Sequence, residues 1–407
     1  MESTSTAERT AAAAPRSPAR SDHVGSLLRP PELLAEIHRV YERGHTTLYA
    51  EERAKDMTRL RELEDEAIRT VVQRQIEAEV DLITDGEFRR VLFTNSFYDA
   101  VEGLEPNPDP LHFYGDDGSV VEHPGPALVS GRLRKVDSPG AREARFLASI
   151  TDRPFKITFP APSWFCFQSL RAPALRNGTY ESVDELLNDT VGILGELASD
   201  AAAAGASCLQ FDEPAYSFLV MPGIDEIVTA MGSSADRLME SSVATDRTFL
   251  EALPDDVTTA VHVCRGNYAS RHMSSGTLDP VAEAMFSLPF DRFLLEWEDV
   301  EREGDFSTLR HVPSPGPIVV LGVLSSKLPR IETEDELMRR IEDATAYLPV
   351  EQLAISPQCG FASALSALGG GDGNELDADT QWRKLEVQAR VAERVWGAGN
   401  QLTEGED

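Results

Sequence analysis

Short apolar runs alternate with helical patterns along most of this chain, and this alternation constrains the fold more than any other feature. Eight runs have the length and composition of β-strands. Several are continuously apolar, which is typical of parallel strands covered on both faces. The eight candidate strands are 21–26, 81–86, 155–159, 208–212, 258–264, 292–297, 318–323 and 353–356. Eight strand–helix units predict an α/β fold of the (β/α)₈ TIM-barrel type.

Helical patterns fill the spaces between these runs. Ser182 is followed three residues on by Glu185, and Thr333 stands in the same relation to Glu336, which is the capping-box signature of a helix start. Further helical patterns cover 31–43, 48–78 and 378–398. An open, doubly wound sheet is the alternative to a barrel. However, the sequence has neither the G-x-G-x-x-G nor the P-loop motif that would mark a nucleotide site.

The alternation predicts a single domain over 21–398 with insertions. Residues 1–20 have no periodicity and are rich in Ala, Ser, Thr, Pro and Arg, so we expect a disordered tail there. A short C-terminal tail is expected over 399–407. Residues 103–150 are rich in Pro, Gly and Asp, and we expect a long loop after the second strand, placed to cover an active site. A second, flexible loop is expected over 366–378.

The charge balance bears on the partners of the protein. The chain of 407 residues has 69 acidic against 38 basic side chains, a net charge of −31, so we expect no nucleic-acid or membrane partner. No run approaches the roughly 18–20 apolar residues of a membrane span. Four cysteines are too few for a disulfide scaffold in a chain of this length. They fit a cytoplasmic protein, in which a Cys/His cluster indicates a metal or catalysis.

Metal-ligating residue types stand at the ends of three candidate strands. His262 and Cys264 lie two residues apart, so in a strand their side chains point to the same side. Glu296 or Glu298 ends the sixth strand, and Cys359 follows the last one. The carboxyl ends of barrel strands converge on the active-site face. Two thiolates, an imidazole and a carboxylate therefore predict a Zn²⁺ site.

Zinc at this position would give the protein thiol chemistry. A zinc ion deprotonates a coordinated thiol, whereas a free thiol with a pKa of about 8.5 is mostly protonated at neutral pH. A small-molecule thiol bound there would become a nucleophile. A lone buried cysteine, in contrast, usually acts as a small apolar residue, and this is our interpretation of Cys166 and Cys208.

Other strand ends have groups suited to binding an amino acid. Asp212 and Glu87 either cap the helices that follow them or receive an α-ammonium group through charge-assisted hydrogen bonds. Ser26 and neighbouring backbone N–H groups would bind the carboxylate, and Gly25 permits a close approach. Trp164 is either part of the core or a stacking wall for a flat donor such as a pterin.

Seven motifs, taken together and in order, resemble the catalytic barrel of the cobalamin-independent methionine synthase family, and especially its short, single-barrel relatives. The resemblance covers about residues 21–398. It implies methyl transfer to homocysteine, giving methionine. The motifs are DHVGSLLRP, ITDGE, FDEPA, HVCRGN, FLLEWED, VVLGVLSSK and SPQCGF.

The resemblance also implies roles for individual residues. The implied zinc ligands are His262, Cys264, Glu296 and Cys359. The resemblance thus favours Glu296 over Glu298 as the carboxylate ligand. It assigns the amino group of homocysteine to Glu87 and Asp212, and the carboxylate of homocysteine to Ser26.

The chain departs from the full-length members of that family in two ways. Those enzymes have an additional N-terminal barrel that helps to bind polyglutamylated folate, and we expect none here. They also have a histidine after the seventh strand that is thought to protonate the departing folate. Lys327 stands near that position here and is a candidate catalytic residue. The methyl donor therefore stays open between methyltetrahydrofolate, a methylated corrinoid protein and another methyl compound.

Three other functions compete with methionine synthesis. The first is zinc-dependent alkyl transfer to another thiol, such as the addition of coenzyme M to an epoxide. That substrate has no α-ammonium group, so Glu87 and Asp212 favour an amino-acid thiol. The second is a structural or metal-buffering zinc protein, but a closed structural site needs no such acids beside it. The third is a decarboxylase related to the porphyrin-processing barrels, which need no zinc.

Overall fold

Six parallel strands form the centre of the protein. The computed structural model describes residues 19–41, 55–362, 365 and 374–397. Within these residues one sheet has the order β3-β4-β5-β6-β7-β8, so each strand pairs with its neighbour in sequence. Every strand agrees with a predicted one to within a residue or two. The strands are β3 (Lys156–Pro160), β4 (Cys208–Asp212), β5 (Thr258–Val263), β6 (Arg292–Glu296), β7 (Ile318–Leu324) and β8 (Leu353–Pro357).

Two short extended segments close this sheet into a ring. Ser21 forms a parallel bridge with Ile355 of β8, and Ile83 forms one with Phe155 beside β3. The Asp81 N–H donates to the Ser21 carbonyl at 2.9 Å, which joins the two segments to each other. The predicted eight-membered TIM-barrel ring is therefore present. The first two predicted strands, however, are reduced to bridges of one residue each.

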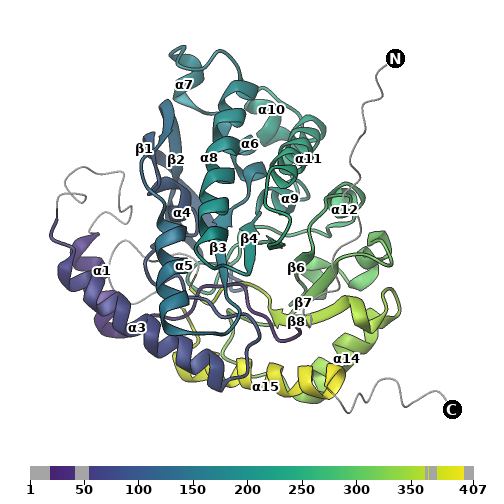
Figure 1. Ribbon diagram of the computed structural model, residues 1–407. Helices are drawn as coiled ribbons and strands as arrows, with labels where there is room; N and C mark the ends of the chain where they lie inside the picture. The colour runs from purple at the N-terminus through teal and green to yellow at the C-terminus, as the bar shows by residue number, and fades with distance from the viewer. Residues whose placement is uncertain (1–18, 42–54, 363–364, 366–373, 398–407) are drawn as a thin grey trace, which may run out of the picture.

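Helices surround the strands (Figure 1). The long helices are α1 (Pro31–Val40), α3 (Thr58–Glu77), α5 (Pro139–Ile150), α8 (Val183–Ala203), α11 (Ala235–Glu251), α14 (Glu334–Thr345) and α15 (Ala378–Trp396). The shorter helices are α4 (Asn95–Tyr98), α6 (Pro162–Ser169), α7 (Pro173–Arg176), α9 (Ala215–Phe218), α10 (Ile224–Ala230), α12 (Asp279–Phe286) and α13 (Val300–Glu303). Two 3₁₀ helices are η1 (Phe306–His311) and η2 (Val350–Gln352). None of the helices in the described ranges is long and apolar enough to cross a membrane.

The predicted caps begin two of these helices. The Thr333 hydroxyl accepts from the Glu336 N–H at 3.2 Å, and the Glu336 carboxylate accepts from the Thr333 N–H at 2.8 Å, so this capping box is complete. The Ser182 hydroxyl accepts from the Glu185 N–H at 3.1 Å. Glu185 reaches back one residue further, to the N–H of Glu181, so only the cap half of the second predicted box forms.

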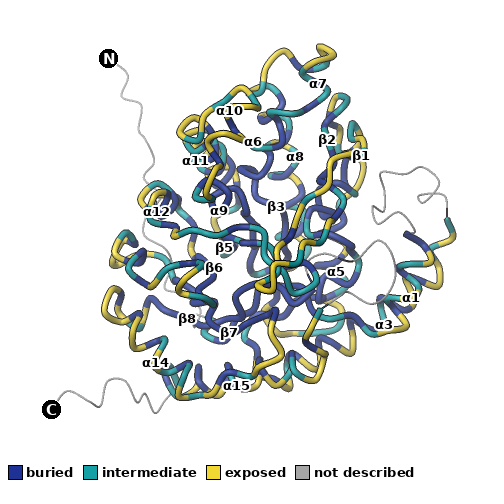
Figure 2. Tube along the Cα trace, turned by 180° about the vertical axis from the view of Figure 1, so that it is seen from behind, coloured by how far each residue is buried: buried dark blue, intermediate teal, exposed yellow. Residues whose placement is uncertain are grey.

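Alternation along the strands separates two apolar regions. Outward-facing side chains pack against the helices in one large core, which appears dark blue around the strands in Figure 2. Inward-facing side chains form a small separate cluster inside the ring, made of Val24, Leu82, Cys208, Ala260, Leu294, Val320 and Ala354. The next inward positions toward the carboxyl ends are polar, for example Gln210, Asp212 and His262. The interior therefore changes from apolar to polar toward the face where the strands end.

Residues 103–150 are not the irregular loop that their composition predicts. They belong to a two-stranded antiparallel hairpin, β1 (Val101–Tyr114) and β2 (Val120–Lys135), and to α5. The pairing has three register shifts. A two-stranded ribbon tolerates prolines and glycines at such irregularities. Proline has no backbone N–H, but each strand of a ribbon pairs on one side only, so no second strand loses a hydrogen bond. Proline content therefore did not exclude strands here.

Some predictions fall outside the described residues. These are the tails, except for residues 19–20, most of the loop 366–378, and the beginning of the helix 48–78.

The outward core predicts the stability effect of one substitution. Phe211 of β4 is fully buried between Phe249, Phe159 and Phe290, with ring centroids 4.8, 6.1 and 6.4 Å away. Phe211→Ala should lower the free energy of unfolding by about 3–5 kcal/mol, because a large cavity replaces these contacts. Denaturant titration followed by circular dichroism measures the loss. The exposed Tyr347 provides the control, since Tyr347→Ala should change this free energy by less than about 0.5 kcal/mol.

Candidate functional site

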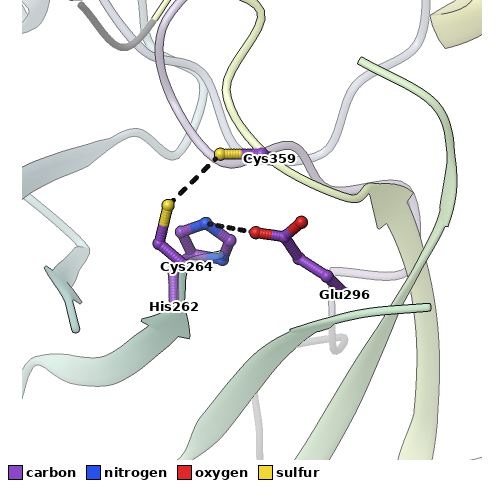
Figure 3. A group of neighbouring side chains, drawn as sticks. All are labelled: His262, Cys264, Glu296 and Cys359. Carbon is purple, nitrogen blue, oxygen red and sulfur yellow. Dashed lines mark hydrogen bonds and ion pairs between the residues drawn. The ribbon is translucent and has the colours of Figure 1, made fainter. Parts of the chain in front are cut away.

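Four metal-ligating side chains meet where the strands end. His262 lies on β5, Cys264 follows β5 directly, Glu296 is the last residue of β6, and Cys359 follows β8 by two residues. One ligand atom from each lies within 4.8 Å of all the others. Figure 3 shows these side chains pointing toward one another, with Cys264 Sγ 3.5 Å from Cys359 Sγ and His262 Nε2 4.0 Å from Glu296 Oε1.

Hydrogen bonds orient two of these groups toward the cluster. His262 Nδ1 lies 3.3 Å from the Leu294 carbonyl, which can only accept, so Nδ1 holds a proton and Nε2 is the ring nitrogen left to face the cluster. Glu296 Oε1 accepts from the Arg265 N–H at 2.6 Å. His262 Nε2 and Glu296 Oε2 are buried and have no hydrogen-bond partner within the described structure. Orphaned buried acceptors of this kind are what a bound cation satisfies.

The ionisable groups of the cluster shift one another's pKa. The hydrogen bond with Cys264, and then His262, hold the pKa of the Cys359 thiol well below its ordinary value, against the effect of burial. The same contact with Cys359, together with burial, raises the pKa of the Cys264 thiol well above its ordinary value. Burial raises the pKa of Glu296 to about 8, although Lys327 acts in the opposite direction.

The donor set fits a borderline-soft metal ion. Two thiolates, one imidazole and one carboxylate are typical ligands of four-coordinate sites. Bonds of about 2.0–2.3 Å in a tetrahedron put ligand atoms about 3.3–3.8 Å apart. The observed sulfur–sulfur distance of 3.5 Å lies in that range, and the nitrogen–oxygen distance of 4.0 Å lies just outside it. Glu298, the alternative carboxylate, lies outside this cluster and accepts from Arg302 Nη2 at 3.0 Å.

A small cavity of about 20 Å³ opens beside the four donors. A space of this size holds about one water molecule. Its lining residues are Val24, Glu87, Phe93, Asp212, His262, Cys264 and Cys359. The structure therefore brings the two predicted substrate-binding acids to the same cavity as three of the four predicted ligands.

The backbone around Glu87 is strained in a way that brings its carboxylate into the cavity. Glu87 has a φ of +59°, and Asp85 Oδ1 accepts from its N–H at 2.8 Å. Gly25 packs against the Glu87 side chain. A Cβ atom on Gly25 would lie 2.7 Å from Glu87 Oε1, and the φ of +151° at Gly25 is one that L side chains rarely adopt. The structure thus shows a close approach of Gly25 to the Glu87 side chain, while the predicted approach of a substrate carboxylate stays a prediction.

Asp212 is buried across the cavity from Glu87. Burial raises the pKa of Asp212 to about 7, and the charge of Glu87 adds to this rise. No lysine or arginine in the described part of the chain forms an ion pair with Asp212 within 4.0 Å. A cationic ligand between the two acids would compensate their charges.

The other predicted site residues lie around the cavity without lining it. Ser26 Oγ accepts from the Ala362 N–H at 3.2 Å, which ties the first segment of the ring to the loop that follows Cys359. Trp164 is buried with its ring centroid 6.1 Å from that of Phe93, and Phe93 is the aromatic residue that lines the cavity. Contacts of Ser26 and Trp164 with a substrate stay predictions.

Lys327 lies between two glutamates. Its Nζ is buried, 3.7 Å from Glu296 Oε2 and 3.9 Å from Glu298 Oε2. These two carboxylates raise the pKa of Lys327 although burial acts to lower it. The ammonium group therefore balances the charge of a candidate metal ligand. Proton donation by Lys327 stays a prediction.

Three residues at the site have no counterpart among the sequence predictions. Thr158 and Gln210 are inward-facing strand residues that bond to Glu87 and Asp212. Period-two alternation was a signal for both, because each stands an even number of residues from another inward-facing polar side chain. Phe93 follows the second segment of the ring in an irregular stretch, and no periodic signal marks it.

The β1–β2 hairpin reaches the loop that holds Cys264. The backbones of Tyr114 and His272 exchange hydrogen bonds of 2.7 and 3.1 Å. Phe113 packs against Tyr268 with ring centroids 5.3 Å apart. The insertion thus contacts the loop after β5 through the end of the hairpin, and its covering of the active site stays a prediction.

Comparisons with known proteins place the chain among similar sequences and structures. A family model described as the catalytic domain of the cobalamin-independent synthase matches residues 42–367. The uncharacterized protein YxjH of Bacillus subtilis is 31% identical over 385 residues, which cover 94% of this chain and 96% of that protein. A crystal structure from Listeria monocytogenes, described as a proposed vitamin-B12-independent methionine synthase, has a TM-score of 0.67 and 28% identity, and covers 94% of this chain and 99% of that one.

A longer enzyme matches in part. The 5-methyltetrahydropteroyltriglutamate–homocysteine methyltransferase of Nitratidesulfovibrio vulgaris is 23% identical over 298 residues, which cover 73% of this chain and 34% of that enzyme. The match to this enzyme thus involves about a third of its length.

The contact between Gly25 and Glu87 predicts a measurable strain. Gly25→Ala should lower the free energy of unfolding by about 1–3 kcal/mol, because the added methyl group meets Glu87 Oε1 and the backbone leaves its preferred region. Denaturant titration measures the change. Gly178→Ala is the matched control, since Gly178 also has a positive φ of +77° but nothing within 4 Å of its Cβ position. An equal loss for both variants would contradict the proposed clash.

Proposed function

The chain belongs to the cobalamin-independent methionine synthase family, and from this premise we propose that it is a zinc-dependent S-methyltransferase that converts homocysteine to methionine. One observation supports this proposal most. A four-donor metal cluster and a pair of buried carboxylates, Glu87 and Asp212, share one cavity. The first suits a thiol and the second an ammonium group, and homocysteine has both on one short chain.

The proposed zinc ligands are His262, Cys264, Glu296 and Cys359. Bound zinc would act as a Lewis acid that lowers the pKa of the substrate thiol, so that it reacts at neutral pH. The Leu294 carbonyl keeps the His262 imidazole in the tautomer that a metal ligand needs. The Arg265 N–H keeps one oxygen of Glu296 in place.

The protein's own groups would orient the amino acid. Glu87 and Asp212 receive the α-ammonium group, which supplies a cation to the buried pair, of which only Glu87 has an ion pair, with Arg90 at 3.9 Å. Ser26 and the backbone beside Gly25 receive the α-carboxylate. Holding the amino acid at its polar end directs the thiol toward the donor cluster. Such positioning lowers the entropic part of the barrier.

Lys327 is the proposed proton donor to the departing group. The supporting observation is its buried ammonium group beside Glu296. The methyl donor that we propose first is 5-methyltetrahydrofolate, because the N. vulgaris relative is named for a methyltetrahydropteroyl donor. A methylcorrinoid protein is the alternative donor, and parallel assays with each donor separate the two.

The ligand assignment predicts the loss of zinc. Cys264→Ser and Cys359→Ser should each weaken zinc binding by roughly 100-fold or more. Even the loss of a residue that only hydrogen-bonds to a metal ligand lowers metal affinity by about 10–100-fold. Chelator competition measures the affinity, and methionine formation should fall with it. Cys166→Ser is the control, because this buried thiol lies outside the cluster. Full activity in either ligand variant would refute the zinc mechanism.

The ammonium site predicts a separable loss. Asp212→Asn should keep its zinc, while the Kd for homocysteine rises about 10- to 100-fold, because one charge-assisted hydrogen bond is lost. Metal analysis and titration calorimetry measure the two quantities. Asp225→Asn, on the surface of α10, should change neither. Unchanged homocysteine affinity in Asp212→Asn would favour a thiol without an amino group, as in alkyl transfer to coenzyme M.

A further inference from the structure

Each carboxylate of the proposed ammonium site is hydrogen-bonded to a neutral polar side chain, and that side chain is in turn hydrogen-bonded to a buried cation. Asp212 is linked through Gln210 to Lys156, and Glu87 is linked through Thr158 to Arg90. Neither link takes part in the mechanism proposed above. The resemblance and the comparisons assign no role to Gln210 or Thr158.

The first link has only one arrangement of donors and acceptors. Lys156 Nζ donates to Gln210 Oε1 at 2.7 Å, and since an ammonium group only donates, this atom of Gln210 must be the oxygen. Gln210 Nε2 then donates to Asp212 Oδ1 at 2.9 Å and to the Val24 carbonyl at 2.6 Å. Gln210 is fully buried, so water does not compete for these bonds. One oxygen of Asp212 is thereby occupied.

The second link is ordered in the same way. Arg90 Nη1 donates to Thr158 Oγ1 at 2.7 Å, and a guanidinium group cannot accept. The Thr158 hydroxyl hydrogen is therefore available to Glu87, and Thr158 Oγ1 lies 2.8 Å from Glu87 Oε1. Arg90 itself is 3.9 Å from that oxygen, beyond hydrogen-bond distance. One oxygen of Glu87 is thereby occupied, as in Asp212.

The strand register makes the two links neighbours. Thr158 of β3 and Gln210 of β4 are directly paired across the ladder. Both side chains point into the ring, so the two carboxylates are supported from below by adjacent residues of adjacent strands. Each link donates a hydrogen bond to a carboxylate from a neutral group, so the cation stands one side chain further away, although Arg90 Nη1 still forms a longer ion pair with Glu87 Oε1 at 3.9 Å.

We propose that Thr158 and Gln210 are positioning residues that hold Glu87 and Asp212 by one oxygen each, so that the second oxygens and the negative charge of both acids face the amino group of the thiol substrate. This inference rests on the proposed function and explains how the site distinguishes an amino-acid thiol from a thiol without an amino group. The selectivity lies in the orientation of the acids as well as in their charge.

The test compares two thiols that differ in the amino group alone. Homocysteine and 4-mercaptobutanoate are titrated calorimetrically into the zinc-loaded full-length protein, so no methyl donor is needed. In Thr158→Val and Gln210→Met we expect the Kd for homocysteine to rise about fivefold or more, with the Kd for 4-mercaptobutanoate and the zinc content unchanged. In these variants Arg90 keeps its hydrogen bonds to the backbone carbonyl of residue 158 and to Glu143, and Lys156 keeps its hydrogen bond to Asp22. Neither cation therefore loses all its partners.

Two further variants separate positioning from general damage. Thr158→Ser retains the hydroxyl and should restore the preference for homocysteine. Thr190→Val removes another fully buried threonine hydroxyl, one that donates to the Leu186 carbonyl within α8, and should leave both affinities unchanged.

Each outcome decides the proposal. If wild-type protein binds the two thiols equally, the ammonium site and the proposed function fail, and this inference fails with them. If wild-type protein prefers homocysteine but Thr158→Val and Gln210→Met keep that preference, or lose affinity for both thiols alike, the positioning role alone is refuted.

Discussion

The in-register pairing of parallel strands is the constraint on which the site depends. Asp212 pairs with His262 across β4 and β5, and Thr158 pairs with Gln210 across β3 and β4. Side chains alternate between the two sides of a strand, so a shift of one residue in any pair would turn these groups out of the ring and into the apolar core. The continuous apolar outward positions oppose such a shift, because it would expose them to the polar interior.

Charge is distributed unevenly inside this ring. Lys156 and Arg292, the first residues of β3 and β6, bind Asp22 at 2.8 and 3.1 Å, so two cations share one carboxylate at the beginning of the strands. The face where the strands end has an excess of acids and thiols, with Lys327 as a buried cation beside Glu296. Buried anions without partners are costly. A metal ion and a cationic substrate group would each remove part of this cost, which is the physical basis for proposing that one cavity binds both ends of an amino-acid thiol.

The alternation of apolar runs and helices was enough to predict the barrel and, to within a residue or two, the bounds of the six strands β3 to β8. The strand 208–212 was predicted to the residue, and the cap at Thr333 formed as expected. The hairpin over 101–135 was missed, because its strands are irregular and contain prolines, which local propensity assigns to loops. The first two ring segments also proved shorter than predicted. Their extended pattern in the sequence did not show that each pairs with a neighbouring strand over a single residue.

Residue types and spacing alone determined the candidate ligands. A histidine and a cysteine two residues apart must share one side of a strand, and that holds without any knowledge of other parts of the chain. Spacing left Glu296 and Glu298 open and the resemblance favoured Glu296, whereas the contact of Gly25 with Glu87 and the two links to the carboxylates were decided by the tertiary structure alone. They depend on distances between residues that are 54 to 71 positions apart in sequence, and only ring closure and strand register define those distances.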